Sequence, residues 1–247
     1  MQNQFDPRLT GVNPATVGVP RAARDVGLRS YMLSVYNYMA SGVLLTGIVA
    51  MLFAPYARDV LINAAGTGMS PIGWVVMLAP LGFVIAMSFG LNRMSTPTLQ
   101  MLFWAFATVM GLSMSTIFIT FTGVSIAQTF FAVSVAFLSL SLWGYTTKKD
   151  LSGWGTFLIM GVVGLLIAML INLFVQSTAM HMAISAIGVL LFAGLTAYDT
   201  QKIKSMYFMV QGTEFIGKSA IMGALTLYLD FINLFMFLLQ FMGQSRE

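Results

Sequence analysis

The chain has 247 residues, of which 58% are hydrophobic and only 8% are charged, whereas soluble domains carry roughly 25% charged residues. So few charged side chains cannot cover the core of a soluble protein of this size, and the composition indicates a surface that faces lipid. The net charge of +4 is spread between apolar segments, which argues against a nucleic-acid-binding domain. The absence of Cys excludes disulfides and thiolate metal sites.

The first 29 residues are polar and contain Pro and Gly without an apolar period, so they predict a flexible cytoplasmic tail over 1–29 and no signal peptide. Seven apolar segments follow, and each is long enough to cross a hydrocarbon core of about 30 Å. They are predicted at 30–54, 71–91, 99–121, 126–145, 153–175, 180–200 and 219–242, before a short C-terminal tail at 243–247. The sequence therefore predicts an all-α fold: one seven-helix transmembrane domain over 30–242 in a polytopic membrane protein.

Two breaks between these segments are short, at 122–125 and 176–179. Tight helical hairpins are the preferred interpretation there, and merged or re-entrant segments are the alternative. Basic residues support seven crossings, because alternate crossing places ten Lys and Arg on the N-terminal side and only Arg58 and Arg246 on the other. The ten are Arg8, Arg21, Arg24, Arg29, Arg93, Lys148, Lys149, Lys202, Lys204 and Lys218. The positive-inside rule then predicts a cytoplasmic N-terminus, at the plasma (inner) membrane if the chain is bacterial.

Small residues recur within the segments, including Gly161, Gly164, Gly188 and Gly194. Small side chains let helix backbones approach each other closely in lipid. The sequence therefore predicts a compact bundle that forms one domain.

Two acidic residues, Asp199 and Asp230, lie in the last two apolar segments. A carboxylate at bilayer depth costs at least about 2.5–3.5 kcal/mol on insertion scales, so it normally faces the interior of a bundle and has a partner. Asn233 and Thr226 share the helix face of Asp230 and form a polar stripe with it.

The last two segments form an antiparallel hairpin that can bring the two aspartates together. With helix ends at the predicted positions their depths differ by roughly 10 Å. The preferred interpretation is a last helix that enters the membrane near Met222, which leaves Gln211–Ile221 as an interfacial segment and reduces this mismatch.

Two carboxyl groups in contact would share one proton and act as a pH-sensitive latch. The protonated pair forms a hydrogen bond, and the ionised pair repels or binds a cation. The alternative is that each aspartate pairs with a polar neighbour and only holds the bundle together. Arg93 lies on the same side and is either a counter-charge for Asp199 or an ordinary anchor.

The stretches Leu28–Ala40 (LRSYMLSVYNYMA), Ala193–Ile203 (AGLTAYDTQKI) and Leu227–Phe235 (LYLDFINLF) resemble the Bax inhibitor-1 family, and the resemblance covers about residues 28–242. It implies a seven-helix bundle with the last helix central. It also implies a calcium leak that is governed by pH through a di-aspartyl pair, which corresponds to Asp199 and Asp230.

The resemblance further implies an arginine latch at Arg93, with Tyr198 and Asn233 as supporting polar residues. Calcium would contact Asp199 and Asp230 transiently as the permeant ion, so no cofactor is expected. The expected partners are membrane lipid, calcium ions and a membrane protease or other membrane protein, and no nucleic acid is expected.

Three functions compete at this point. The leading hypothesis is a pH-sensitive calcium (cation) leak channel, which is not an enzyme. The second is a non-conducting regulator of a membrane protease or of a stress or cell-death response, which docks on a membrane protease or channel through the tail 1–29. The third is an intramembrane aspartyl protease, which Tyr198-Asp199 resembles, but the Gly-x-Gly-Asp of those enzymes is replaced by Leu227-Tyr-Leu-Asp230 here.

Overall fold

The computed structural model describes residues 21–66 and 68–246. This part of the chain folds into eight helices and contains no strand beyond isolated bridges. The helices are α1 (Arg21–Leu61), α2 (Pro71–Gly90), α3 (Thr96–Met114), α4 (Ile117–Thr120), α5 (Gly123–Thr146), α6 (Ser152–Val175), α7 (Thr178–Val210) and α8 (Phe215–Met242). The prediction of an all-α fold is confirmed.

Seven stretches of the described chain are long and apolar enough to cross a membrane, as predicted. The short helix α4 continues α3, and the two together form the third span, Thr96–Thr120. Both short breaks are tight turns between antiparallel helices, so the alternative of merged segments is wrong. The turn before α7 contains Gln176 in the left-handed conformation at φ 53°, which ends α6 within one residue.

Serine and threonine side chains start four of the helices. Each occupies the N-cap position and accepts a hydrogen bond from a backbone N–H in the first turn, which satisfies a group that the helix itself leaves without a partner. These caps are Ser70 for α2, Ser95 for α3, Thr122 for α5 and Ser177 for α7. These four helices start within three residues of the predicted starts of their spans.

Helix α1 begins at Arg21 and not at residue 30, so the last part of the predicted tail is helical. The remainder of that tail, residues 1–20, lies outside the described residues. With 41 residues, α1 is about 60 Å long and extends well beyond a hydrocarbon core of about 30 Å.

Helix α7 continues to Val210, beyond the predicted end of its span at residue 200. Ile203 and Tyr207 lie one turn apart on its buried face, so packing against neighbouring helices extends the helix. Lys204 directs its ammonium group to the carbonyl oxygen of Tyr145 at 2.7 Å and keeps its aliphatic part against the bundle. The polar residues after Asp199 therefore mark a change of environment and not the end of the helix.

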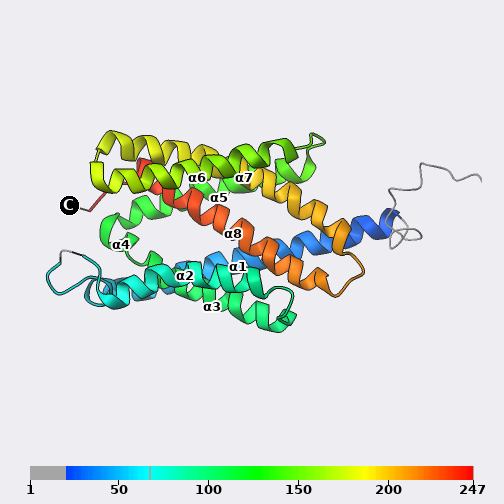
Figure 1. Cartoon of the computed structure of the whole chain (residues 1–247), viewed down its shortest axis with the longest axis horizontal. Coiled ribbons are helices and arrows are strands. Elements are labelled where there is room, and N and C mark those ends of the chain that lie inside the picture. Colours follow the sequence, from blue (N-terminus) through cyan, green and yellow to red (C-terminus); the bar gives the residue numbers. More distant parts are fainter. Residues whose placement is uncertain (1–20, 67, 247) are drawn as a thin grey trace, which may run out of the picture.

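The helices form two layers, with α1, α2 and α3 in one and α5, α6 and α7 in the other, and α8 crosses between them (Figure 1). Helix α8 packs against α1, α3, α5 and α7. Of its most apolar stretch 67% is buried, compared with 11–39% in the other six spans. This burial confirms that the last helix is central.

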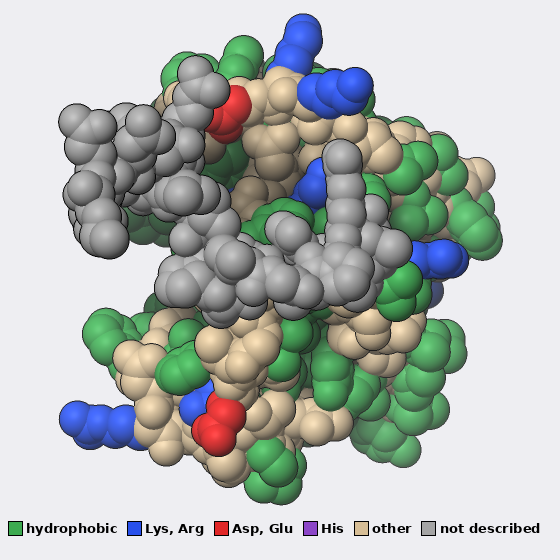
Figure 2. All heavy atoms as spheres, turned by 90° about the vertical axis from the view of Figure 1, so that its right-hand side faces the viewer, with side chains coloured by type: hydrophobic (Ala, Val, Ile, Leu, Met, Phe, Trp, Pro, Cys, Tyr) green, Lys and Arg blue, Asp and Glu red, His purple; other side chains and the backbone are tan. Residues whose placement is uncertain are grey.

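The start of α1 and the α2–α3, α5–α6 and α7–α8 connections all lie at one end of the bundle, on the right in Figure 1. We call it the basic end, because Lys and Arg side chains surround it (Figure 2). Arg58 and Arg246 belong to the opposite end. The alternation of the seven spans agrees with the predicted charge asymmetry, while the side of the membrane that the basic end faces stays a prediction.

A hydroxyl contact joins α8 to α1 and α3 in the centre of the bundle. Thr46 donates its proton to the carbonyl oxygen of Ala107 at 2.8 Å, so the 2.7 Å contact with Tyr228 is donated by the tyrosine. The Tyr228 ring is fully buried and packs edge-on against Phe103 and Phe106.

Replacing Tyr228 with Phe should lower the free energy of unfolding by about 1 kcal/mol, because one buried hydrogen bond is lost while the ring packing is kept. Thermal unfolding of the detergent-solubilised protein measures the change. Tyr56→Phe is the matched control, since Tyr56 is 62% exposed near the opposite end. An equal loss of stability in both variants would contradict the role of the Tyr228 hydroxyl.

Candidate functional site

Asp199 on α7 and Asp230 on α8 meet inside the bundle. Their exposed fractions are 8% and 4%, and the two carboxyl groups interact electrostatically with each other. A carboxylate only accepts hydrogen bonds, so a hydrogen bond between the two groups requires a proton on one of them.

The extension of α7 brings the two aspartates to similar depths. Asp199 lies eleven residues before the end of α7 at Val210, and Asp230 lies fifteen residues after the start of α8 at Phe215. The difference of four residues corresponds to about 6 Å along the axis, which a tilt between the helices can absorb. Residues from Phe215 onward are already helical, so most of the predicted interfacial segment Gln211–Ile221 forms the first part of α8, and the point at which this helix enters the membrane stays a prediction.

A glycine allows α7 and α8 to approach each other next to the pair. Gly223 on α8 lies against Ile203 on α7, and a Cβ at this position would come within 3.1 Å of the isoleucine side chain. A small residue at a contact between two helices is typical of membrane proteins.

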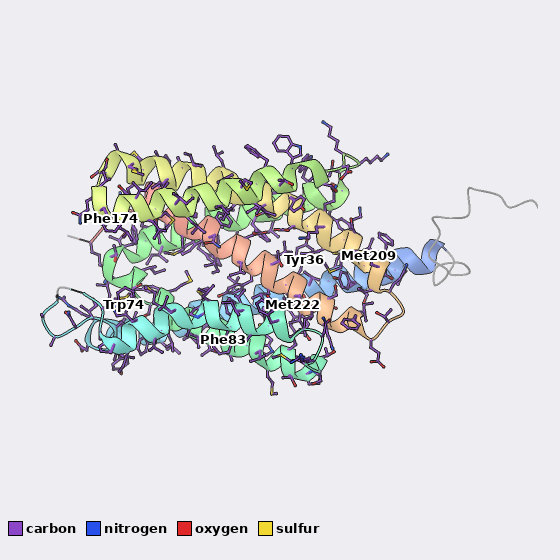
Figure 3. The ribbon with its side chains drawn as sticks, viewed as in Figure 1. Tyr36, Trp74, Phe83, Phe174, Met209 and Met222 are labelled. Atoms are coloured by element: carbon purple, nitrogen blue, oxygen red, sulfur yellow. The ribbon has the colours of Figure 1, made fainter. Side chains whose placement is uncertain are left out.

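A cavity of about 290 Å³ lies beside Asp199, on the side of the pair that faces the basic end. Lys202 lines it and interacts electrostatically with the Asp199 carboxyl group. Figure 3 labels Met222, which contributes to the wall from α8. The other lining residues are Leu91, Ile203, Met206, Val210, Phe215, Ser219, Gly223 and Thr226. Asp199 is thus the member of the pair nearest to this cavity.

Aromatic side chains pack around α8 at and beyond Asp230. Oδ2 of Asp230 is inaccessible and has no hydrogen-bond partner in the described part of the chain. Phe231, which follows it, packs edge-on against Phe130 and Phe137 at centroid distances of 5.7 and 5.5 Å. Farther along α8, Phe237 stacks on Phe192.

Gln201, two residues after Asp199, joins α7 to the α5–α6 loop at the basic end. Its side-chain nitrogen donates to the carbonyl oxygen of Lys149, and its side-chain oxygen accepts from the backbone N–H of Leu151, both at 2.8 Å. These two bonds attach the α5–α6 loop to α7.

The other predicted site residues do not join the pair. Arg93 is exposed in the α2–α3 turn and forms no ion pair with either aspartate among the described residues. Tyr198 lies against α6, where a Cβ on Gly155 would overlap its hydroxyl group. Asn233 donates to the carbonyl oxygen of Leu229 at 2.8 Å within α8. The latch and supporting roles of these residues stay predictions.

Lys202 is the cation that interacts with the aspartate pair, and the sequence predicted it only as a topology residue. Its position three residues after Asp199 places both on one helix face. Within the described residues no group of three or more His, Cys, Asp or Glu side chains gathers. Calcium takes six to eight oxygen ligands, so two carboxyl groups suit brief contact with a partly hydrated ion better than stable binding.

These features define the class of the molecule, a seven-helix integral membrane protein with an acidic pair between its last two helices. A family model described as "Inhibitor of apoptosis-promoting Bax1" matches residues 28–247. The chain therefore belongs to the Bax inhibitor-1 family.

Three bacterial relatives show how far the similarity extends. An uncharacterized protein of Rickettsia prowazekii is 47% identical over 90% of this chain and 93% of its own length. The inner membrane protein YbhL of Escherichia coli is 43% identical over 92% and 95%. An uncharacterized membrane protein of Streptococcus pyogenes is 34% identical over 90% and 95%. The chain is thus similar to these membrane proteins along nearly their full length.

Proposed function

We propose that the protein is a pH-sensitive calcium (cation) leak in which Asp199 and Asp230 are both the proton sensor and the ion contact. The observation that carries the proposal is the meeting of two buried carboxyl groups at the end of a cavity. With one proton the pair is a hydrogen bond that holds α7 against α8. Without it, two negative charges repel each other and attract a cation.

The surroundings of the pair support this gating. The cavity beside Asp199 gives ions access from the basic end, and Lys202 at its wall opposes cation entry until both aspartates are ionised. The aromatic contacts of α8 beyond Asp230 hold this helix against its neighbours, and in this proposal α8 shifts relative to them when the protein conducts. With the N-terminus in the cytoplasm, as the basic residues predict, the cavity faces the cytoplasm.

The test is calcium flux into liposomes that contain the purified protein, measured at equal pH on both sides between pH 5.5 and 8.5. Flux should rise with pH, by up to roughly tenfold per unit while the shared proton is being lost, since the ionised fraction grows at that rate. The variant Asp199→Asn with Asp230→Asn should lose this rise, because the amides neither titrate nor attract calcium strongly.

The matched control replaces Asp59 and Asp150, which are exposed and lie away from the pair, with Asn. It should keep the flux and the pH profile of the unmodified protein. If the variant of the aspartate pair kept both instead, the leak proposal would be overturned and the non-conducting regulator would be favoured.

A further inference from the structure

A second cavity, of about 440 Å³, lies between α1 and α5 and opens to the outside of the bundle. Its walls are apolar, with Met32 and Leu33 from α1 and Leu138 and Leu142 from α5. The three leucines Leu33, Leu138 and Leu142 are 51%, 64% and 63% exposed, so in a membrane lipid reaches the cavity. The volume lies within the range of about 300–1,000 Å³ that is typical of small-ligand sites.

The floor of the cavity has no free hydrogen-bond donor. Tyr36, labelled in Figure 3, contacts Ser141 at 2.6 Å, and Ser141 contacts Thr200 at 2.9 Å. Thr200 gives its proton to the carbonyl oxygen of Thr196, so Ser141 donates to Thr200 and Tyr36 donates to Ser141. The hydroxyl protons of Tyr36, Ser141 and Thr200 are thus all donated within the described part of the protein. The floor of the cavity therefore has no donor left for an anion, whereas it can contact an acyl chain.

The mouth of the cavity is cationic. Arg29 lines it at the basic end, seven residues or about 10 Å along α1 from Tyr36. Arg29 makes no ion pair or hydrogen bond within the described part of the chain. Tyr145 forms the other side of the mouth, and the Lys204 ammonium lies 4.9 Å from the centre of its ring. Among the described side chains, none that lines this cavity is acidic.

We propose that this cavity binds an anionic phospholipid, with the phosphate group at Arg29 and one acyl chain between α1 and α5. An apolar slot that opens to lipid and ends at an arginine matches a headgroup of net negative charge above a hydrocarbon chain. A zwitterionic lipid brings an ammonium group to the same place, where Arg29 and Lys204 repel it.

Native mass spectrometry of the full chain in detergent tests the proposal, with phosphatidylglycerol and phosphatidylethanolamine added at equal concentration. One phosphatidylglycerol should bind about fivefold more tightly than phosphatidylethanolamine, the preference that one basic residue gives near a membrane surface. Arg29→Gln should remove this preference. Arg58→Gln, at the other end of the same helix, should keep it.

Leu142→Trp should weaken the binding of both lipids, because the larger ring fills the slot from a position that is already exposed. If this variant does not fold, the comparison of Arg29→Gln with Arg58→Gln still tests whether Arg29 determines the preference for the anionic lipid. Equal binding of both lipids by the unmodified protein, or equal behaviour of the two arginine variants, would overturn the proposal. Displacement of the bound lipid by inorganic phosphate alone would overturn it as well, because the acyl chain would then not contribute.

Discussion

A leucine in place of Gly144 is expected to lower the melting temperature of the purified protein by about 10 °C, or to prevent folding. Gly144 on α5 lies directly against the backbone of Ala197 on α7, and even a Cβ would overlap the alanine carbonyl oxygen. A clash with backbone is not relieved by a rotamer change, so the two helices must separate. Overpacking costs about 1–3 kcal/mol, which corresponds to about 2–4 °C per kcal/mol in a chain of this size.

Gly164→Leu is the matched control, because nothing lies within 4 Å of the position of its Cβ on α6. This variant should unfold within about 2 °C of the unmodified protein, as surface substitutions usually do. Thermal unfolding followed by light scattering or fluorescence compares the two. If both leucines cost the same, the packing of α5 on α7 at Gly144 is not what holds these helices together.

The protein should also become less stable as the pH rises from 5.5 to 8.5, and Asp230→Asn should remove most of this dependence. In the proposed leak the folded pair shares one proton, which two separate carboxyl groups in the unfolded chain release. The folded state is therefore the more protonated one, and the free energy of unfolding falls as pH rises. A loss on the order of 2 kcal/mol is expected over this range, because each pH unit of differential titration amounts to about 1.4 kcal/mol.

Asp150→Asn is the control for this experiment. Asp150 lies outside the membrane-spanning segments, and its hydrogen bonds with Ser152 hold the pKa of its carboxyl group below the usual range. It therefore stays ionised throughout the experiment, and its replacement should leave the slope of stability against pH unchanged. A slope in Asp230→Asn equal to that of the unmodified protein would show that the pair does not share a proton.

The spans and the aspartate pair could be predicted because they depend on the length of the apolar segments and on the type of residue within them. Each apolar segment is long enough to cross the membrane, and carboxyl groups at that depth need a partner. The length of α7 was not predictable in the same way. Its residues after Asp199 are polar, and the buried positions of Ile203 and Tyr207 that continue the helix depend on neighbours distant in the chain.

Which of the small residues contact a neighbouring helix could not be predicted from the sequence either. Gly161, Gly188 and Gly194 do contact neighbouring helices, whereas Gly164 faces open space. Gly144, which lies against the backbone of α7, was not singled out. The sequence shows that a residue is small, but the rotation of each helix decides which face meets a neighbour.

The two hydrogen bonds of Gln201 have a mechanical consequence. They attach the α5–α6 loop to α7 close to Asp199, at both Lys149 and Leu151. In the proposed leak, a shift of α7 that separates Asp199 from Asp230 would carry this loop and its two lysines with it. Opening would then displace positive charge at the basic end, which a charged label on the loop would detect.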